Sequence, residues 1–130
     1  MLKLKGRVQV NPTESLEKVK AAVERLFSNL KFEFKEGEAG GILFFSSTGL
    51  DSLSKFKRIA RQDMIRDAVR SYLKARIQGN SIRFYLNKQV AYAGHISLCE
   101  PEGESPLGPI EVEIECLNLK EVVDWLTEKP

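Results

Sequence analysis

The residues best suited to chemistry in this 130-residue chain are cations gathered near its middle. The segment Leu50–Gln78 carries eight basic residues against three acidic ones, a net charge of +5 in a chain whose total is +2. The basic residues are Lys55, Lys57, Arg58, Arg61, Arg66, Arg70, Lys74 and Arg76. Cations at this density attract polyanions, above all the phosphates of a nucleic acid. The commoner meaning of the pattern is a solvated helix face with ion pairs, so both interpretations stay open.

The same segment predicts helix, because it lacks proline and has no glycine before Gly79. Its apolar residues form two stripes: Leu53, Phe56, Ala60 and Met64 in one, then Ile65, Val69, Tyr72 and Leu73 in the other, with Arg76 on the same face as the second. At about 100° per residue the stripes face roughly opposite directions, so one straight helix cannot turn both to one core. We expect two helices or a kink, broken between Ala60 and Met64, with Asp63 as the N-cap of the second helix. The alternative is one straight helix packed on both sides.

A second polar group, Asn87-Lys88-Gln89, lies between two apolar stretches. Amides can bond base edges or sugar hydroxyls, and a lysine can meet a phosphate. The amides could instead satisfy the backbone where the chain changes direction. Tyr85 and Tyr92 are candidates for stacking on bases. The predicted RNA-binding residues are Arg58, Arg61, Arg66, Arg70, Lys74, Asn87, Lys88 and Gln89.

No group of residues in the sequence has the spacing of a catalytic or metal site. His95 is the single histidine and is expected half-buried on a strand. Ser105 does not lie in a nucleophile elbow, and Cys99 and Cys116 match no metal or redox spacing. We therefore expect no enzyme, no cofactor, no metal and no small-molecule substrate. Glu104–Pro109 is expected to be a structural turn set by its prolines and glycine.

Composition and length are those of an ordinary globular domain, with 42% hydrophobic and 29% charged residues. We expect a single α+β domain over residues 1–130. The longest apolar run, Ile42–Phe45, is far too short to span a membrane, and the N-terminus lacks an apolar signal core. The two widely spaced cysteines fit a cytoplasmic protein with reduced thiols and no membrane partner.

Alternation of apolar and polar residues predicts six strands, at Leu2–Val10, Lys31–Glu36, Ile42–Ser47, Ser81–Leu86, Gly94–Cys99 and Ile110–Cys116. A helix is expected after Thr13 as N-cap, another after Asn118, and Gly79-Asn80 is expected to stop the basic helices. The element order is β-α-β-β-α-α-β-β-β-α. Strands that alternate have one wet face, so we expect a mostly antiparallel sheet with helices on the other face, a two-layer α+β sandwich.

Two rows of opposite charge lie on the wet sides of predicted strands. Lys3, Lys5 and Arg7 form one row, and Glu111, Glu113 and Glu115 form the other. Opposite charges on neighbouring strands are stabilising, so we expect the two strands to be adjacent or the two rows to share one face. The segment Glu100–Pro130 has a net charge of −7, which could neutralise the basic middle within the fold or within a dimer, or could confine an anion to one side.

Three strings resemble an archaeal family often labelled RNA-binding: RQDMIRDAVRS at Arg61–Ser71, LNKQVAYAG at Leu86–Gly94 and ESPLGPIEVEIE at Glu104–Glu115. That family includes a predicted exosome subunit, and its fold is similar to that of the fifth large-subunit ribosomal protein. The resemblance covers nearly the whole chain and implies RNA as the partner, with no catalytic residue to carry over. The first hypothesis is therefore a non-catalytic RNA-binding module. The alternative is an assembly subunit, as a homodimer or with an acidic partner, without a nucleic-acid role.

Overall fold

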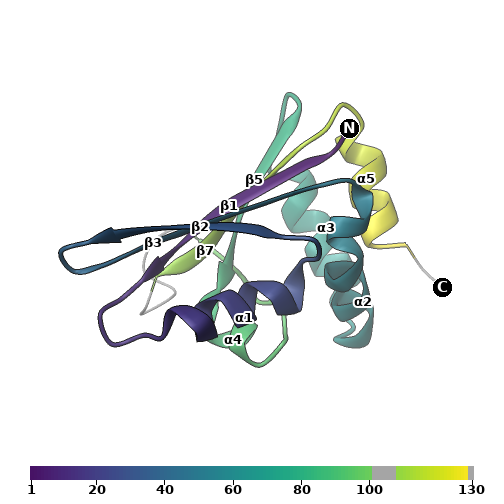
Figure 1. Cartoon of the computed structure of the whole chain (residues 1–130). Coiled ribbons are helices and arrows are strands. Elements are labelled where there is room, and N and C mark those ends of the chain that lie inside the picture. The colour runs from purple at the N-terminus through teal and green to yellow at the C-terminus, as the bar shows by residue number, and fades with distance from the viewer. Residues whose placement is uncertain (101–107, 129–130) are drawn as a thin grey trace.

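The computed structural model describes residues 1–100 and 108–128, and there it contains a seven-stranded antiparallel sheet and five α-helices (Figure 1). The strands are β1 (Lys3–Val10), β2 (Lys31–Gly37), β3 (Gly40–Thr48), β4 (Ile77–Gln78), β5 (Ser81–Asn87), β6 (Leu98–Cys99) and β7 (Pro109–Glu115). The helices are α1 (Leu16–Leu26), α2 (Ser54–Gln62), α3 (Arg66–Lys74), α4 (Lys88–Tyr92) and α5 (Leu119–Leu126), and a short 3-10 helix, η1 (Leu50–Leu53), precedes α2.

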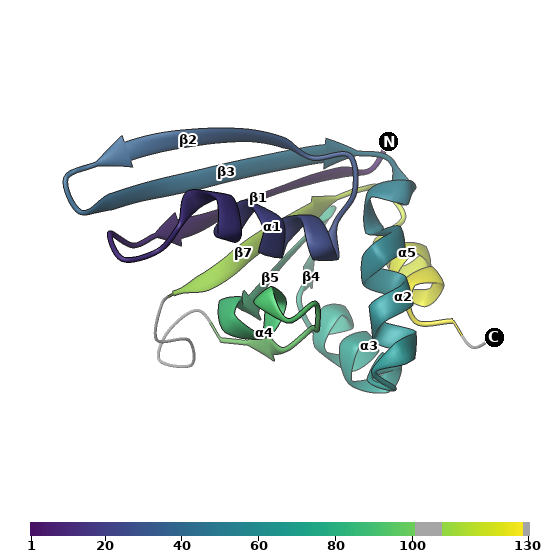
Figure 2. The ribbon, with the colours of Figure 1, turned by 60° about the horizontal axis from the view of Figure 1, so that its bottom comes forward.

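The strand order is β2-β3-β1-β7-β5-β4, with β6 paired to β5. The helices lie to one side of this sheet, and the opposite face stays open, as Figures 1 and 2 show. The predicted two-layer α+β sandwich is confirmed. The predicted element order lacks β4 and the short helix α4. The predicted Glu104–Pro109 turn falls mostly outside the described residues.

The core lies between the sheet and the helices, and alternate residues of each long strand reach into it. Gly6 occupies one of these inward positions, where an added Cβ would overlap the ring of Phe45 and the backbone oxygen of Glu111. The missing side chain lets Phe45 pack against β1. There its ring stacks on Phe27 with the centroids 6.2 Å apart. Phe27 stacks in turn on Phe56 of α2, at 5.8 Å, which ties the helix layer to the sheet.

The predicted break in the basic helices is confirmed. Helix α2 ends at Gln62, Met64 adopts a left-handed φ of 58°, and α3 begins at Arg66. Two details were wrong. Asp63 is the C-cap of α2, whereas the N-cap of α3 is Ile65. Met64 is 89% exposed and belongs to no buried stripe, because the turn itself directs it to solvent.

Three local expectations differ from the structure, and a fourth agrees in part. The N-cap of α1 is Ser15, whose hydroxyl accepts from the Lys18 N–H, and not Thr13. Helix α3 already ends at Lys74, so Gly79-Asn80 instead forms the turn between β4 and β5. His95 is exposed and precedes the short β6 instead of lying on a strand. Asn118 is the N-cap residue of α5, as predicted, but its side chain makes no capping hydrogen bond.

The predicted pairing of the charged rows is confirmed. Strands β1 and β7 are antiparallel neighbours, with Lys5 opposite Glu113 and Arg7 opposite Glu111. The Lys5 Nζ lies 3.3 Å from Glu113 Oε1, and the Arg7 Nε lies 2.7 Å from Glu111 Oε2.

Within residues 1–100 and 108–128, no helix combines the length and the apolar character needed to cross a bilayer.

Candidate nucleic-acid interface

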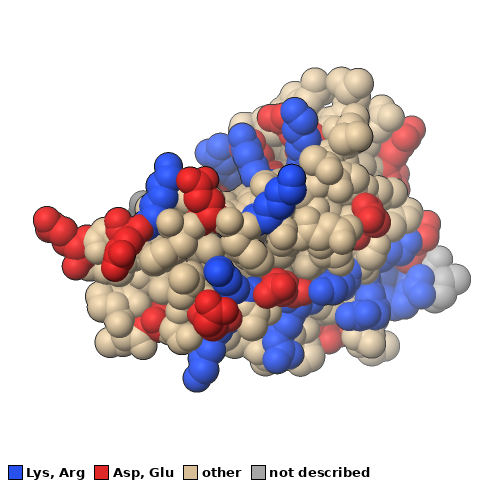
Figure 3. Space-filling view, in the orientation of Figure 1, with Lys and Arg blue, Asp and Glu red and all other residues tan. Residues whose placement is uncertain are grey.

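Helix α2 presents two arginines to solvent. Arg58 and Arg61 are exposed, and neither has an ion-pair partner among the residues that the structure describes. Their position follows from the high amphipathicity of the helix, because Phe56, Ile59 and Ala60 are turned into the core on the opposite side. In Figure 3, Lys and Arg side chains gather over the α2 and α3 region at the lower right.

Two cations of α3, Arg70 and Lys74, are already paired with an acid of the C-terminal helix. Asp124 of α5 lies 3.0 Å from the Arg70 guanidinium and 2.9 Å from the Lys74 ammonium. The hydrogen bond from Lys74, together with the charge of Arg70, holds the pKa of Asp124 below its ordinary value. Arg66 donates to the backbone oxygen of Glu128 at 3.0 Å. A phosphate that binds α3 must therefore replace these partners.

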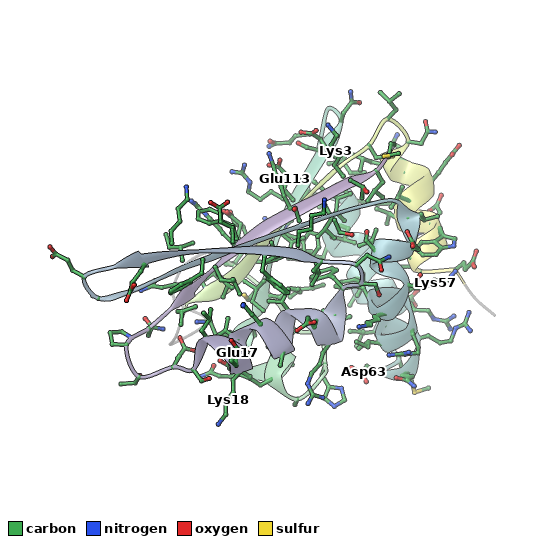
Figure 4. All side chains as sticks on the ribbon, viewed as in Figure 1. Lys3, Glu17, Lys18, Lys57, Asp63 and Glu113 are labelled. Carbon is green, nitrogen blue, oxygen red and sulfur yellow. The ribbon has the colours of Figure 1, made fainter. Side chains whose placement is uncertain are left out.

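A further cation of α2, Lys57, is held by two neighbours. Its ammonium lies 4.2 Å from the centroid of the Trp125 ring and forms an ion pair with the carboxylate of Glu128. Figure 4 shows Lys57 at the side of α2 that faces the C-terminal end of the described chain. Lys57 thus anchors α5 and its extension to α2. The remaining cation of α2, Lys55, donates to the backbone oxygen of Glu24 at 2.7 Å, so the α2 cations without a partner among the described residues are Arg58 and Arg61.

The turn after α2 is fixed by the single histidine of the chain. His95 Nδ1 lies 2.9 Å from a carboxylate oxygen of Asp63, and this contact joins the loop after α4 to the α2–α3 turn. Figure 4 shows Asp63 at the lower end of the helix pair. The contact positions the C-terminal end of α2, where Arg61 lies.

Lys88 does not lie on the surface, contrary to its predicted role as a phosphate contact. Its side chain is 0% exposed, and its ammonium donates to the backbone oxygen of Gln9 at 2.6 Å and to Glu14 Oε1 at 2.9 Å. Glu14 also accepts from the Tyr92 hydroxyl at 3.2 Å. Burial, and secondarily the charge of Glu14, raises the pKa of Tyr92 to about 12. These groups join α4 to the β1–α1 connection, so Lys88 and Tyr92 are structural.

The neighbours of Lys88 have different environments. Asn87 is the N-cap of α4, and its side-chain oxygen accepts from the Val90 N–H at 3.0 Å, so the backbone interpretation of Asn87 is confirmed. Gln89 is exposed on α4. The structure therefore separates three residues that are consecutive in the sequence.

A hollow on the open face of the sheet was not predicted from the sequence. It is lined by cations, aromatic rings and three glutamates from β1, β2, β3, β5 and β7, among them Lys5, Lys31 and Phe44. Lys31 and Phe44 alternate with inward residues along their strands, which indicates that both lie on the wet face, but only the strand order brings these two side chains together. Among the described residues, no three His, Cys, Asp or Glu side chains come together as a metal site.

Comparison with known proteins gives a consistent assignment. A family model described as "RNA binding" matches residues 3–116. A UPF0201 protein of Sulfurisphaera tokodaii is 47% identical over 131 residues, covering 99% of this chain and 89% of that protein. A UPF0201 protein of Metallosphaera sedula is 40% identical over 129 residues, covering 99% and 90%.

The fold agrees with a solved relative. The crystal structure of a UPF0201 protein from Methanococcus jannaschii superposes with a TM-score of 0.86 at 27% identity, covering 96% of this chain and 98% of that one. The names of these three relatives describe no enzyme. The relation to an exosome subunit and the likeness to the fifth large-subunit ribosomal protein stay predictions. The family match and the identities show that the chain belongs to this RNA-binding family, together with the archaeal UPF0201 proteins.

Proposed function

We propose that this protein is a non-catalytic RNA-binding module whose primary contact surface is the exposed side of α2. The observation that carries the proposal is the pair of solvent-exposed arginines, Arg58 and Arg61, without ion-pair partners among the described residues of a chain whose family is described as RNA binding. Arginine suits this role because its planar guanidinium can meet a phosphate with two parallel hydrogen bonds.

The remaining predicted residues contribute in a graded way. Arg66, Arg70 and Lys74 extend the surface along α3, but each already has an acidic or carbonyl partner at about 3 Å. We expect them to bind phosphate only by exchanging that partner, and so more weakly than Arg58 and Arg61. Gln89 is exposed and available for a base or sugar, whereas Lys88 is buried and has no place on the surface.

The alternative of an assembly subunit has less support. It allowed either an acidic partner protein or a homodimer, in which the acidic end of the chain meets the basic middle of a second copy. Within one chain, Asp124 and Glu128 already pair with Arg70, Lys74 and Lys57. These acids are therefore occupied within the chain, whereas the two arginines of α2 are open to a polyanion.

The test is a binding titration with labelled cellular RNA at several salt concentrations. Arg58→Gln/Arg61→Gln should weaken binding of all RNA sequences and lower the salt slope by about 1.4, because each lost phosphate contact removes about 0.7 on a single strand. The control, Lys18→Gln/Lys120→Gln, makes the same change in net charge at exposed lysines of α1 and α5.

The control variant should show the wild-type salt slope, apart from the decrease that its lower net charge causes by itself. Equal effects of the two double variants would show that α2 is not the contact surface. If the wild-type protein bound no RNA in a salt-dependent way, the RNA proposal would fail, and sedimentation of the free protein would then test the homodimer.

A further inference from the structure

The open face of the sheet, opposite the helices, is hollowed along its length. One hollow, about 580 Å³ in volume, has its floor on β1, β2, β3, β5 and β7. Its lining includes Lys5, Arg7, Lys31, Phe44 and Arg83. It shares Arg83 and Glu113 with a second hollow of about 580 Å³, and Arg7 and Glu111 with a third of about 630 Å³. The three form a continuous trough, which we call the sheet trough.

Strand pairing places cations in one row across this trough. The row runs in the order Lys31, Ser46, Lys5, Glu113 and Arg83. Neighbouring strands are about 4.8 Å apart, so the three cations recur at intervals of about 10 Å. Because residues paired across strands share a face, all three side chains rise on the side away from the helices.

A second row, two residues farther along each strand, carries aromatic rings. It runs in the order Glu33, Phe44, Arg7, Glu111 and Tyr85. The two rows are about 7 Å apart along the strands, since each residue advances the strand by about 3.4 Å. The Lys35 ammonium lies 5.3 Å from the centroid of the Phe44 ring, so a base that stacks on this ring takes the position of that cation.

Two acids of the trough, Glu113 and Glu111, lie beneath the cations, whereas the third, Glu33, is exposed on β2. The Glu113 side chain is 15% exposed, against 66% for Lys5 and 59% for Arg83, its two partners. The hydrogen bond from Arg83 keeps the pKa of Glu113 below its ordinary value, so the carboxylate stays charged and orients both cations. Glu111, at 21%, lies below Arg7, at 58%, in the same way. Lys and Arg side chains project from the sheet along the upper edge of Figure 3, and Figure 4 shows Lys3 and Glu113 on this side.

We propose that the sheet trough binds a single-stranded RNA segment, with phosphates on the row of Lys31, Lys5 and Arg83 and a base stacked on Phe44. Phe44 and Tyr85 are half-buried, and cations interleaved with such rings suit unpaired nucleotides, because every base offers a face for stacking. A duplex hides those faces within its base stack. The inference rests on the proposed function and adds a second contact surface, on the opposite side of the sheet from α2.

The test uses a fluorescein-labelled oligouridylate of about 10 nucleotides, within the usual site size of single-strand binders. In an anisotropy titration, Lys5→Gln/Lys31→Gln should weaken binding and lower the salt slope by about 1.4. Phe44→Leu should weaken binding about fivefold and leave the slope unchanged, because it removes stacking and keeps apolar volume. Lys18→Gln/Lys120→Gln is the control for net charge, and a thermal melt of each variant verifies folding.

A direct readout that needs no variant is photocrosslinking of a 4-thiouridine oligomer to the wild-type protein, which should modify peptides of β3 and β5. Wild-type affinity in both trough variants, with crosslinks confined to α2 and α3, would overturn this inference and leave the proposed function standing. A wild-type protein that bound no RNA of any length would overturn both. If Lys5→Gln/Lys31→Gln altered sedimentation of the free protein but not oligouridylate binding, the face would contact a second copy, and the inference would also be overturned.

Discussion

The Lys88 ammonium is buried in a polar cluster whose members come from distant parts of the chain. Its carboxylate partner, Glu14, is 74 residues away in sequence. Burial by itself would raise the pKa of Glu14, but hydrogen bonds from Asn11 and Lys88 outweigh it, so the pKa lies below its ordinary value of 4.5. The Lys88–Glu14 pair joins α4 to the β1–α1 connection. The local sequence around Lys88 gave no sign of this partner, so its polar neighbours suggested a surface role.

Removing one member of this pair should be strongly destabilising. Glu14→Gln leaves a buried ammonium without a counter-charge, and we expect a loss of about 3 kcal/mol in the free energy of unfolding. Lys88→Met should lose a similar amount. The double variant should lose less than the sum by at least about 1 kcal/mol, because it buries no unpaired charge. Urea denaturation measures all three, and Lys18→Met on exposed α1 should stay within about 0.5 kcal/mol of wild type.

The same pair makes stability depend on pH. Since folding lowers the pKa of Glu14, its contribution is complete above about 4.5 and is lost as the pH falls through the folded-state pKa. Wild type should therefore lose more stability than Glu14→Gln between about pH 5 and about pH 3. Parallel pH profiles of wild type and Glu14→Gln would contradict the role given to the Lys88–Glu14 pair. A Lys88→Met variant that folds but binds RNA more weakly would contradict the structural role of Lys88, because Lys88 would then contact RNA.

At the scale of elements, the sequence was enough to predict where the helix breaks, but not which side-chain contacts form at the break. The change of apolar phase after Ala60 is a local signal, and α2 and α3 separate where it predicts. The role of Asp63 depends on His95, which arrives from a loop 32 residues later. For the same reason the charge of α3 was overestimated, because Asp124 of α5 lies against it only in the fold.

Asp124 should therefore act as a competitor of RNA phosphates. Asp124→Asn frees Arg70 and Lys74, so RNA affinity should rise severalfold and the salt slope should increase by up to about 1.4. The matched control is Asp67→Asn, which removes the same charge from an exposed position on α3 that has no ion-pair partner among the described residues. Filter binding at several salt concentrations measures both. If the two variants gain equally, net charge alone is responsible and Asp124 has no specific effect.

At the scale of the whole molecule, alternation along the strands was enough to predict the α+β class and the wet face of the sheet. The opposite charges of the two rows also predicted that β1 and β7 are adjacent or share a wet face, and the structure pairs Lys5 with Glu113 and Arg7 with Glu111. The sheet trough could not be predicted, because it needs the order β2-β3-β1-β7-β5. Two-residue alternation fixes which face a residue joins, but it does not fix which strands become neighbours.

The two proposed surfaces lie on opposite sides of the sheet, which has a consequence for RNA length. An oligomer of about 10 nucleotides can occupy one surface at a time, whereas one about four times longer can reach both. Once a long RNA is bound at one surface, its binding at the second surface is intramolecular. The long RNA should therefore bind at least about tenfold more tightly than its larger number of binding sites alone would explain.

Anisotropy with the two lengths, using wild type, Arg58→Gln/Arg61→Gln, Lys5→Gln/Lys31→Gln and the combined variant, measures this gain. Each double variant should remove the length dependence, because avidity requires both surfaces at once. The combined variant should reduce affinity for both lengths. A length dependence that persists in Lys5→Gln/Lys31→Gln but disappears in Arg58→Gln/Arg61→Gln would place all contacts on the helix side. RNA would then follow α2 and α3 around one face of the molecule and leave the sheet trough unused.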